Sequence, residues 1–261
     1  MQIIFGEQVP SYTIGNSVTN IGSSAFSNCT GLTSVTIPNS VSSIGDGAFE
    51  NCSSLSSITI PNSVTNIESG AFKGCSGLTK VIVKDIGAWC NISFKNGLSN
   101  PLYYAKHLYS DENTEITNLV IPNRVKNIGD NAFYGCSSLT TITIPNSVTS
   151  IGYQAFDGCI CLTKIYCYKE EPLYIVYSVF SGVPKNGTLH VPIGCGDAYR
   201  NADVWKEFYI VEDLTTGIVS IDNSRLTNDN DVWYTLSGTR LNGKPTKAGI
   251  YIVNGKKVMI K

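Results

Sequence analysis

Residues 40–62 read SVSSIGDGAFENCSSLSSITIPN, and this stretch decides the fold because it recurs at a period of 23 residues. Close copies occupy residues 17–39, 63–85, 124–146 and 147–169. A repeat of this length is typical of solenoid proteins, in which each unit forms one coil and neighbouring coils stack. We therefore predict a solenoid of stacked coils.

Each copy can be interpreted as one coil with a short strand. In residues 17–39, Leu32, Val35 and Ile37 follow the order L-x-x-V-x-I, and the last two alternate as a strand with one buried face. The Pro-Asn pair that follows ends the strand, because proline cannot donate to a β ladder and asparagine favours turns. Phe26 is expected on a short helical turn, filling the middle of the coil. One unit cannot bury its own apolar face, so stacking must build the core.

The pattern IGxxAFxxCxxLxxVxIPxSV resembles the BspA-like class of leucine-rich repeats, over roughly residues 9–211. It departs from the ordinary leucine-rich repeat in having Phe and Cys where that class has Leu and Asn. The resemblance implies an α/β repeat solenoid, a right-handed superhelix with short parallel strands. It also implies a cell-surface or extracellular protein that adheres to host or bacterial surface proteins and is not an enzyme.

The copies divide the chain into segments. Residues 1–16 match the end of a coil whose beginning is missing, so we expect the natural chain to extend upstream, unless residues 1–8 form an irregular cap. The later segments should be three repeats, an insert-bearing repeat, two repeats, a terminal repeat with a capping helix, and a small C-terminal β module. These correspond to residues 17–85, 86–123, 124–169, 170–213 and 214–261.

Residues 86–115 interrupt the repeat, and we interpret them as replacing the helical half of one coil, with the strand half continuing from Ile116 to Ile121. Inserts in solenoids map to loops on one face, and such loops often bind ligands. Alternatively, the aromatic rings pack the enlarged coil onto its neighbours, because Trp and Tyr carry a large apolar area. The aromatic residues of this insert are Trp89, Phe94, Tyr103, Tyr104 and Tyr109.

The last part of the chain should end the core and then form a separate module. Asp197 is expected to cap a helix that places Trp205 and Phe208 over the end of the core. In residues 214–261, the Asn254-Gly255 pair between alternating apolar runs predicts a β-hairpin. This segment resembles the C-terminal β modules of secreted Bacteroides-type proteins, and the resemblance implies a sorting signal for export.

The nine cysteines raise the question of metal or redox chemistry. Zinc sites require two closely spaced pairs of ligands, and the spacing of Cys159 and Cys161 has no matching second pair. We interpret the cysteines at the repeat position as small, buried core residues. A disulfide among Cys161, Cys167 and Cys195 stays open. The repeat-position cysteines are Cys29, Cys52, Cys75, Cys136 and Cys159.

Composition and motifs exclude several classes of function. The net charge of −1 argues against a nucleic-acid partner, because phosphate binding needs a basic patch. No apolar run approaches the roughly 18 residues of a membrane helix, so no membrane insertion is expected. The two histidines, His107 and His190, lie in different coils, and no GxSxG, HExxH or Walker A motif occurs. We therefore predict no catalytic site, no metal and no cofactor.

The face of the stacked strands is the predicted binding surface. The residue between the two strand aliphatics should point outward, and this column begins with threonines and becomes apolar and aromatic further along the chain. Amphipathic aromatics around an apolar centre are typical of interfaces. Alternatively, these residues reflect strand propensity alone. The candidate binding residues are Ile82, Val120, Thr143, Tyr166, His190, Lys80 and Lys164.

The expected function is non-enzymatic binding of a protein ligand from the host matrix or a bacterial surface. One alternative is a carbohydrate-binding module, for which Tyr103, Tyr104 and Tyr166 would have to form a platform. Another is a spacer within a larger surface protein. A glycan partner therefore stays open beside the protein ligand.

Overall fold

The computed structural model describes residues 9–215, 233–235, 240–241, 245, 249–253 and 256–260. The chain divides into two compact units, Met1–Glu212 and Asp213–Lys261, which are taken separately below. The predicted N-terminal coil end is thus described only from Val9 onward, and residues 1–8 lie outside the described part.

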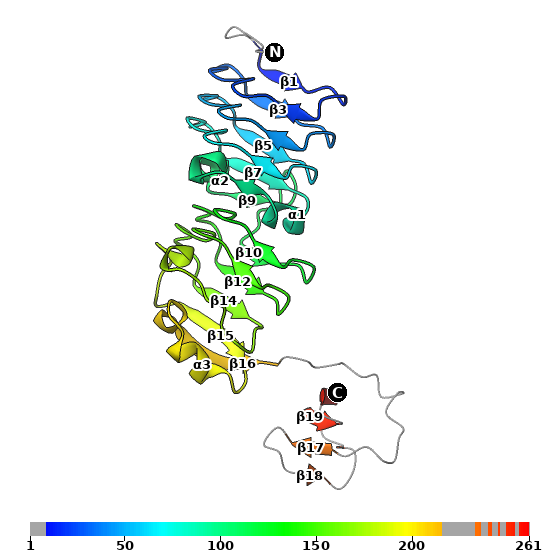
Figure 1. Cartoon of the computed structure of the whole chain (residues 1–261), viewed down its shortest axis with the longest axis vertical. Helices are drawn as coiled ribbons and strands as arrows, with labels where there is room; N and C mark the ends of the chain where they lie inside the picture. The colour runs from blue at the N-terminus through cyan, green and yellow to red at the C-terminus, as the bar shows by residue number, and fades with distance from the viewer. Residues whose placement is uncertain are drawn as a thin grey trace. The chain divides into compact units, whose positions relative to one another are not determined.

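The principal strands of the first unit lie side by side, one per coil (Figure 1), and the strand pairs between residues 11 and 192 are parallel. Between the regular coils, register partners are separated by the repeat period, so that Val35 lies opposite Tyr12 and Ile142 opposite Leu119. The short strand predicted in each coil is therefore confirmed. The strands are β1 (Ser11–Thr13), β3 (Ser34–Thr36), β5 (Ser57–Ile60), β7 (Lys80–Val83), β9 (Leu108–Tyr109), β10 (Asn118–Val120), β12 (Thr141–Ile144), β14 (Lys164–Cys167), β15 (Thr188–Pro192) and β16 (Tyr209–Leu214).

A second ladder of two-residue strands follows the Pro-Asn corner of each coil. Its isoleucines stack in register, for example Ile21 with Ile44 and Ile44 with Ile67, and all three are buried. The segment around Ala25 and Phe26 that completes the coil is a run of turns rather than a helix. The second-ladder strands are β2 (Asn20–Ile21), β4 (Ser43–Ile44), β6 (Asn66–Ile67), β8 (Ser93–Phe94), β11 (Asn127–Ile128) and β13 (Ser150–Ile151).

Phenylalanine rings run through the middle of the stacked coils. The rings of Phe26 and Phe49 stack with their centroids 5.1 Å apart, and those of Phe49 and Phe72 lie 5.3 Å apart. A second stack joins Phe133 to Phe156 at 5.3 Å. Because each ring contacts the ring of the next coil, burial and ring stacking both stabilise the arrangement of neighbouring coils.

The insert forms a coil of its own, so its interpretation as replacing only the helical half of a coil is wrong, whereas the strand half predicted from Ile116 to Ile121 is present as β10. It contributes β8 to the second ladder and β9 to the principal ladder, where Ile82 lies opposite Tyr109. The sequence did not reveal these strands because each has two residues and neither follows the repeat. The helical elements of the insert are α1 (Ile86–Cys90), the 3₁₀ helix η1 (Gly97–Ser99) and α2 (Leu102–Ala105).

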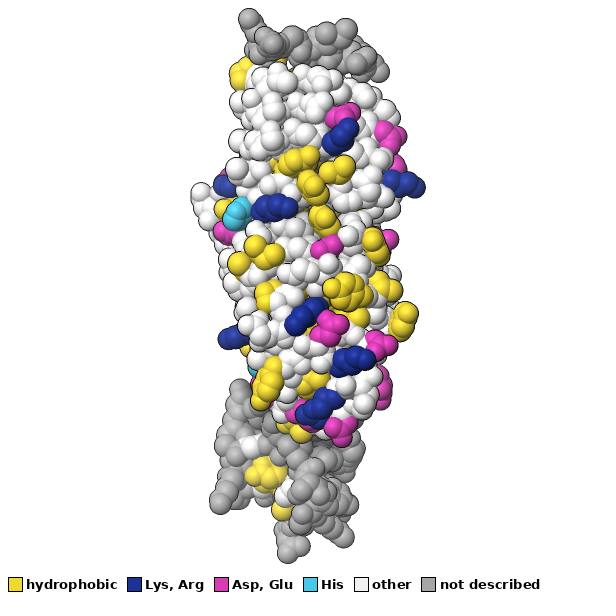
Figure 2. Space-filling model, turned by 90° about the vertical axis from the view of Figure 1, so that its left-hand side faces the viewer, with side chains coloured by type: hydrophobic (Ala, Val, Ile, Leu, Met, Phe, Trp, Pro, Cys, Tyr) yellow, Lys and Arg dark blue, Asp and Glu magenta, His cyan; other side chains and the backbone are white. Residues whose placement is uncertain are grey.

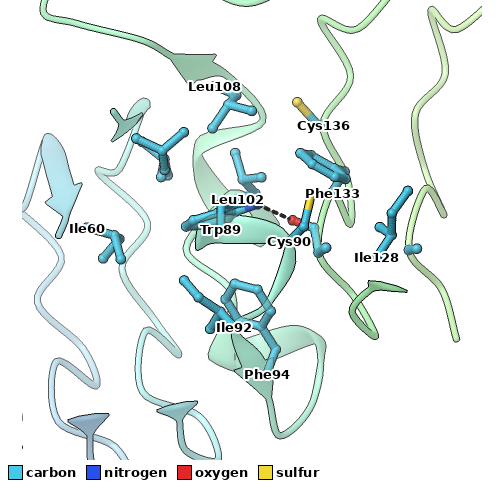
Figure 3. Close-up of a cluster of buried hydrophobic side chains, with 14 of the residues drawn as sticks. Ile60, Trp89, Cys90, Ile92, Phe94, Leu102, Leu108, Ile128, Phe133 and Cys136 are labelled. Carbon is cyan, nitrogen blue, oxygen red and sulfur yellow. Dashed lines mark hydrogen bonds between the residues drawn. The ribbon is translucent and has the colours of Figure 1, made fainter. Parts of the chain in front are cut away.

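Trp89 and Phe94 pack the insert onto the neighbouring coils, as the second interpretation of its aromatics expects. They are 1% and 4% exposed, and the indole Nε1 of Trp89 donates to the carbonyl of Ala132 at 2.8 Å. Figure 3 shows Trp89 among buried side chains of the insert and of adjacent coils, including Leu102 and Phe133. These contacts carry the hydrophobic core across the interruption.

A helical cap covers the C-terminal end of the first unit. Its elements are η2 (Tyr177–Phe180), α3 (Gly196–Asn201) and η3 (Trp205–Glu207). Asp197 lies in the first turn of α3 and pairs with Arg200 at 2.7 Å, so its predicted role as the helix cap is wrong. Trp205 is fully buried, donates to the carbonyl of Leu173 and packs on Phe180, which completes the core as expected.

The second unit contains a four-stranded antiparallel sheet in the order β18-β17-β19-β20. Val253 of β19 lies opposite Lys256 of β20, so the predicted hairpin strands are confirmed, while Asn254 and Gly255 themselves lie outside the described residues. The strands are β17 (Trp233–Thr235), β18 (Arg240–Leu241), β19 (Gly249–Val253) and β20 (Lys256–Ile260).

Candidate functional site

Four of the predicted binding residues occupy consecutive positions on neighbouring strands. Val120 pairs with Thr143, Thr143 with Tyr166, and Tyr166 with His190. They therefore form one row across β10, β12, β14 and β15, which we call the strand-face row. Because the backbone of each strand is fixed by its neighbours, the row is a preorganised surface.

Ile82 does not belong to this row. It is 2% exposed, and its partner in the next strand is Tyr109 rather than Val120. Its selection as a binding residue is wrong because the insert supplies a strand that the sequence interpretation lacked. Lys80, beside it, donates to the carbonyl of Glu112 and lies 4.6 Å from the ring centroid of Tyr109.

The row is apolar and aromatic except at Thr143, with Val120 exposed and Tyr166 and His190 half-buried. Val120 is 58% exposed, and the rings of Tyr166 and His190 stack with centroids 4.5 Å apart at an interplanar angle of 23°. His190 Nε2 lies 3.1 Å from Thr188 Oγ1, which fixes the orientation of the imidazole. Lys164 is exposed on the same strand as Tyr166. The row thus offers an apolar side chain, an aromatic pair and a nearby cation.

A histidine and a carboxylate meet near the end of the insert. His107 Nδ1 lies 2.7 Å from Glu115 Oε1. Partial burial alone would raise the pKa of Glu115, but the neighbouring side chains, His107 first, outweigh it and hold that pKa below its usual range. Glu115 is therefore ionised at neutral pH and holds His107 in place.

The repeat-position cysteines are buried and free, as are Cys90 and Cys167, whereas Cys161 is exposed and Cys195 is partly buried. The thiol of Cys52 lies 3.0 Å from the carbonyl oxygen of Phe26, one coil back, and donates to it. Burial and the neighbouring thiols raise the pKa of Cys52 to about 12. These thiols are thus protonated structural groups, and the sequence interpretation as buried core residues is confirmed.

Within the described part of the chain, no group of three or more His, Cys, Asp or Glu side chains is placed to hold a metal ion. The tyrosine platform imagined for a carbohydrate ligand is also not formed as predicted. Tyr103 and Tyr104 contact each other at 4.9 Å between centroids, but Tyr166 stacks on His190 in the strand-face row.

A solenoid of short parallel strands with one open strand face defines a leucine-rich-repeat protein. The sequence model of the BspA type leucine-rich repeat region matches six copies, over residues 5–99 and 107–201. The chain therefore belongs to the BspA-type leucine-rich-repeat family. The match does not include residues 214–261, so the sorting role suggested for that segment stays a prediction.

Several solved structures are similar to parts of the chain, and none of the curated proteins matches it. A leucine-rich-repeat protein of T. pallidum is 21% identical, with a TM-score of 0.38, over 76% of this chain and 80% of that one. A leucine-rich cell surface protein of Faecalibacterium prausnitzii is 23% identical, with a TM-score of 0.40. That match covers 82% of this chain but 54% of the other, so this chain spans about half of its length.

Family membership suggests a role in protein interaction or as a scaffold, and proteins of this type are typically found at the cell surface or outside the cell. The family consists of repeat proteins and not of known enzymes. Among the described residues, no helix has the length and apolar character needed to cross a bilayer.

Proposed function

We propose that this chain is a surface or secreted adhesion protein that binds a protein ligand of the host matrix or of a bacterial surface through the strand-face row. The single observation that supports this most is the placement of exposed Val120 and the stacked Tyr166–His190 pair in one register row, with Thr143 between them. Aromatic residues around an apolar centre are enriched where proteins bind each other.

The physical basis is a rigid surface with few side chains to order. The branched Cβ of Val120 restricts its χ1 angle, and the Tyr166 and His190 rings already support each other, so binding costs little conformational entropy. Lys164, exposed two residues before Tyr166 on the same strand, would form part of the hydrated rim of such a contact, and Thr143 adds a hydroxyl within the row. The N-terminal coils carry threonines at the same register positions and supply no comparable apolar centre.

The experiment compares capture of proteins from a soluble extracellular-matrix extract by the wild type and by a Val120→Ser, Tyr166→Ala double variant. The matched control is Thr36→Ala, Thr59→Ala, which changes the equivalent positions of two N-terminal coils. We expect the first variant to lose at least nine-tenths of the captured protein and the control to retain it. Equal capture by all three would exclude the row and favour a spacer role.

A further inference from the structure

A groove of about 520 Å³ lies on the turn face of the repeat region, between α2 and the turns that follow Phe133 and Phe156. Figure 2 shows the side that carries α2 in Figure 1, where hydrophobic side chains are sparse over the N-terminal coils and gather toward the middle. This groove is distinct from the strand-face row. Its volume is within the range of small-molecule sites.

Three tyrosines line the groove in a fixed arrangement. The rings of Tyr103 and Tyr134 are parallel within 2° with centroids 5.7 Å apart, and Tyr104 meets Tyr103 edge to face. The hydroxyl of Tyr104 accepts a hydrogen bond from the backbone of Gly74 at 2.9 Å. The rings are therefore positioned before any ligand arrives, which reduces the entropic cost of binding.

Glycines form the floor of the groove, although the backbone conformation at these positions does not require glycine. Gly135 and Gly158 have φ values of 71° and 74°, and the same repeat position is Asn28 and Asn51 in the N-terminal coils, with φ values of 61° and 59°. There the two amides bond to each other, Asn51 Nδ2 to Asn28 Oδ1, at 3.0 Å. Asparagine thus adopts this conformation elsewhere in the chain. Glycine at the groove leaves open the space that an asparagine side chain would fill.

One cation faces this hollow. Lys106 Nζ lies 5.0 Å from the ring centroid of Tyr103 and rests against Gly135, where an added Cβ would be 2.8 Å away. It is the single charged residue among those that line the groove. Asp157 is close enough to contribute to a raised pKa of Tyr134, after burial as the main cause. Its carboxylate accepts from Gln154 at 2.7 Å and is not part of the lining.

We propose that this groove binds a saccharide that carries a carboxylate, with the apolar face of a sugar ring against the tyrosines and the carboxylate on Lys106. Aromatic rings offer an apolar surface beside hydroxyls, and an ammonium forms a strong charge-assisted hydrogen bond with a carboxylate. The hydroxyl of Ser137, which also lines the groove, can pair with the hydroxyls of the sugar.

The backbone of the groove favours a saccharide over an acidic peptide. A peptide bound in extended form needs free backbone donors along an edge. Here Gly135 donates its N–H to the carbonyl of Asp157, and Gly158 donates to that of Ser181, so both lining amides are already used between coils. A ligand that is recognised through ring faces, hydroxyls and one charge needs no free backbone donors.

The test is calorimetric titration of the full chain with two acidic probes, tetragalacturonate and 3′-sialyllactose, which separate uronate from sialic acid. The neutral partners are methyl-esterified tetragalacturonate and lactose, and a tetraglutamate peptide represents the acidic-peptide class. We expect at least one acidic saccharide to bind, and its neutral partner and the peptide to bind at least tenfold more weakly. Failure of both acidic probes, or equal affinity for a neutral partner or the peptide, would overturn the proposal.

Two variants assign the binding to the groove. Lys106→Gln removes the charge at the surface, and Gly158→Asn fills the floor with the residue that the fold accepts at the equivalent coil positions. Each variant should bind the acidic saccharide at least tenfold more weakly than the wild type, whereas Tyr166→Ala in the strand-face row should leave this affinity unchanged. Unchanged affinity in Lys106→Gln would contradict the proposal even if Gly158→Asn failed to fold. Protein capture by Lys106→Gln should match the wild type, which separates this site from the proposed adhesion surface.

Discussion

At the scale of single residues, the buried thiols of Cys52, Cys75 and Cys159 connect neighbouring coils. Each donates to the carbonyl of the phenylalanine one coil back, at 3.0, 3.0 and 3.3 Å. Their burial could be predicted from the repeat, because the position is always occupied by a small apolar side chain between core residues. The hydrogen bond could not, since it depends on the distance between coils.

Thiol reactivity should separate these cysteines sharply. Cys161 is exposed, whereas burial raises the pKa of Cys52, Cys75, Cys90 and Cys136 to about 12, so these four hold almost no thiolate at neutral pH. We expect a maleimide reagent to modify Cys161 within minutes in the native protein and the four buried thiols only after unfolding. Peptide mass spectrometry measures both rates, and fast native modification of Cys52 would contradict the structure.

The buried thiols should also make stability depend on alkaline pH. The pKa of Cys52 is about 12 in the folded chain and has its ordinary value of 9.0 when unfolded, so its stabilising contribution is complete below pH 9 and is lost as pH rises toward 12. Cys52→Ala should cost about 1–2 kcal/mol at about pH 8. That cost should shrink by about 1–2 kcal/mol at about pH 10.5. At that pH the thiol ionises in the unfolded wild type and lowers its stability, whereas the variant has no thiol to ionise.

Urea unfolding of the wild type and Cys52→Ala at both pH values measures this difference. Cys161→Ala is the matched control, because its exposed thiol should leave the free energy of unfolding unchanged. A Cys52→Ala cost that is the same at both pH values would show that Cys52 has an ordinary pKa in the folded state.

At the scale of elements, the insert shows where sequence patterns stop being informative. The regular coils follow one pattern, so their strands, corners and core positions could be read directly. The insert follows no pattern, yet its Phe94 and Leu108 enter both ladders as buried residues. Tyr134 could have been recognised from a weaker signal. It is the one aromatic at a repeat position that is otherwise occupied by Ser27, Glu50, Lys73 and Asp157.

Trp89 should hold the insert coil to the coil that follows. Replacing it with phenylalanine removes the hydrogen bond to Ala132 and part of a fully packed side chain, which should cost about 2–3 kcal/mol. Tyr109→Phe, a partly exposed change in the same insert, should cost less than about 1 kcal/mol. Chemical denaturation measures both variants, and similar costs would mean that Trp89 does not join the coils.

At the scale of the repeat region, the stability of each coil should depend on the coils beside it, because each coil contacts only its neighbours. Trp205 covers the last coil, so Trp205→Ala should expose the end of the core and cost about 3–5 kcal/mol. Hydrogen exchange should accelerate most in β15, less in β12 and least in β3. Uniform acceleration across all coils would contradict nearest-neighbour stacking.

The strand-face row shows which surface positions a repeat can predict. The row from Val120 to His190 followed from counting residues, because the coils there are uninterrupted. The burial of Ile82 did not, since it depends on a strand that the insert supplies. The tyrosine groove was also beyond the sequence, because Tyr103 and Tyr134 meet only after the insert is folded back onto the next coil.

We propose above that the strand-face row is the adhesion surface. The most direct measurement is hydroxyl-radical footprinting of the chain alone and in complex with the protein it captures most strongly from matrix extract. We predict at least fivefold protection of Tyr166 and His190, with Tyr12 and the groove residue Tyr134 unchanged. Protection confined to Tyr134, or absent from Tyr166 and His190, would contradict the claim.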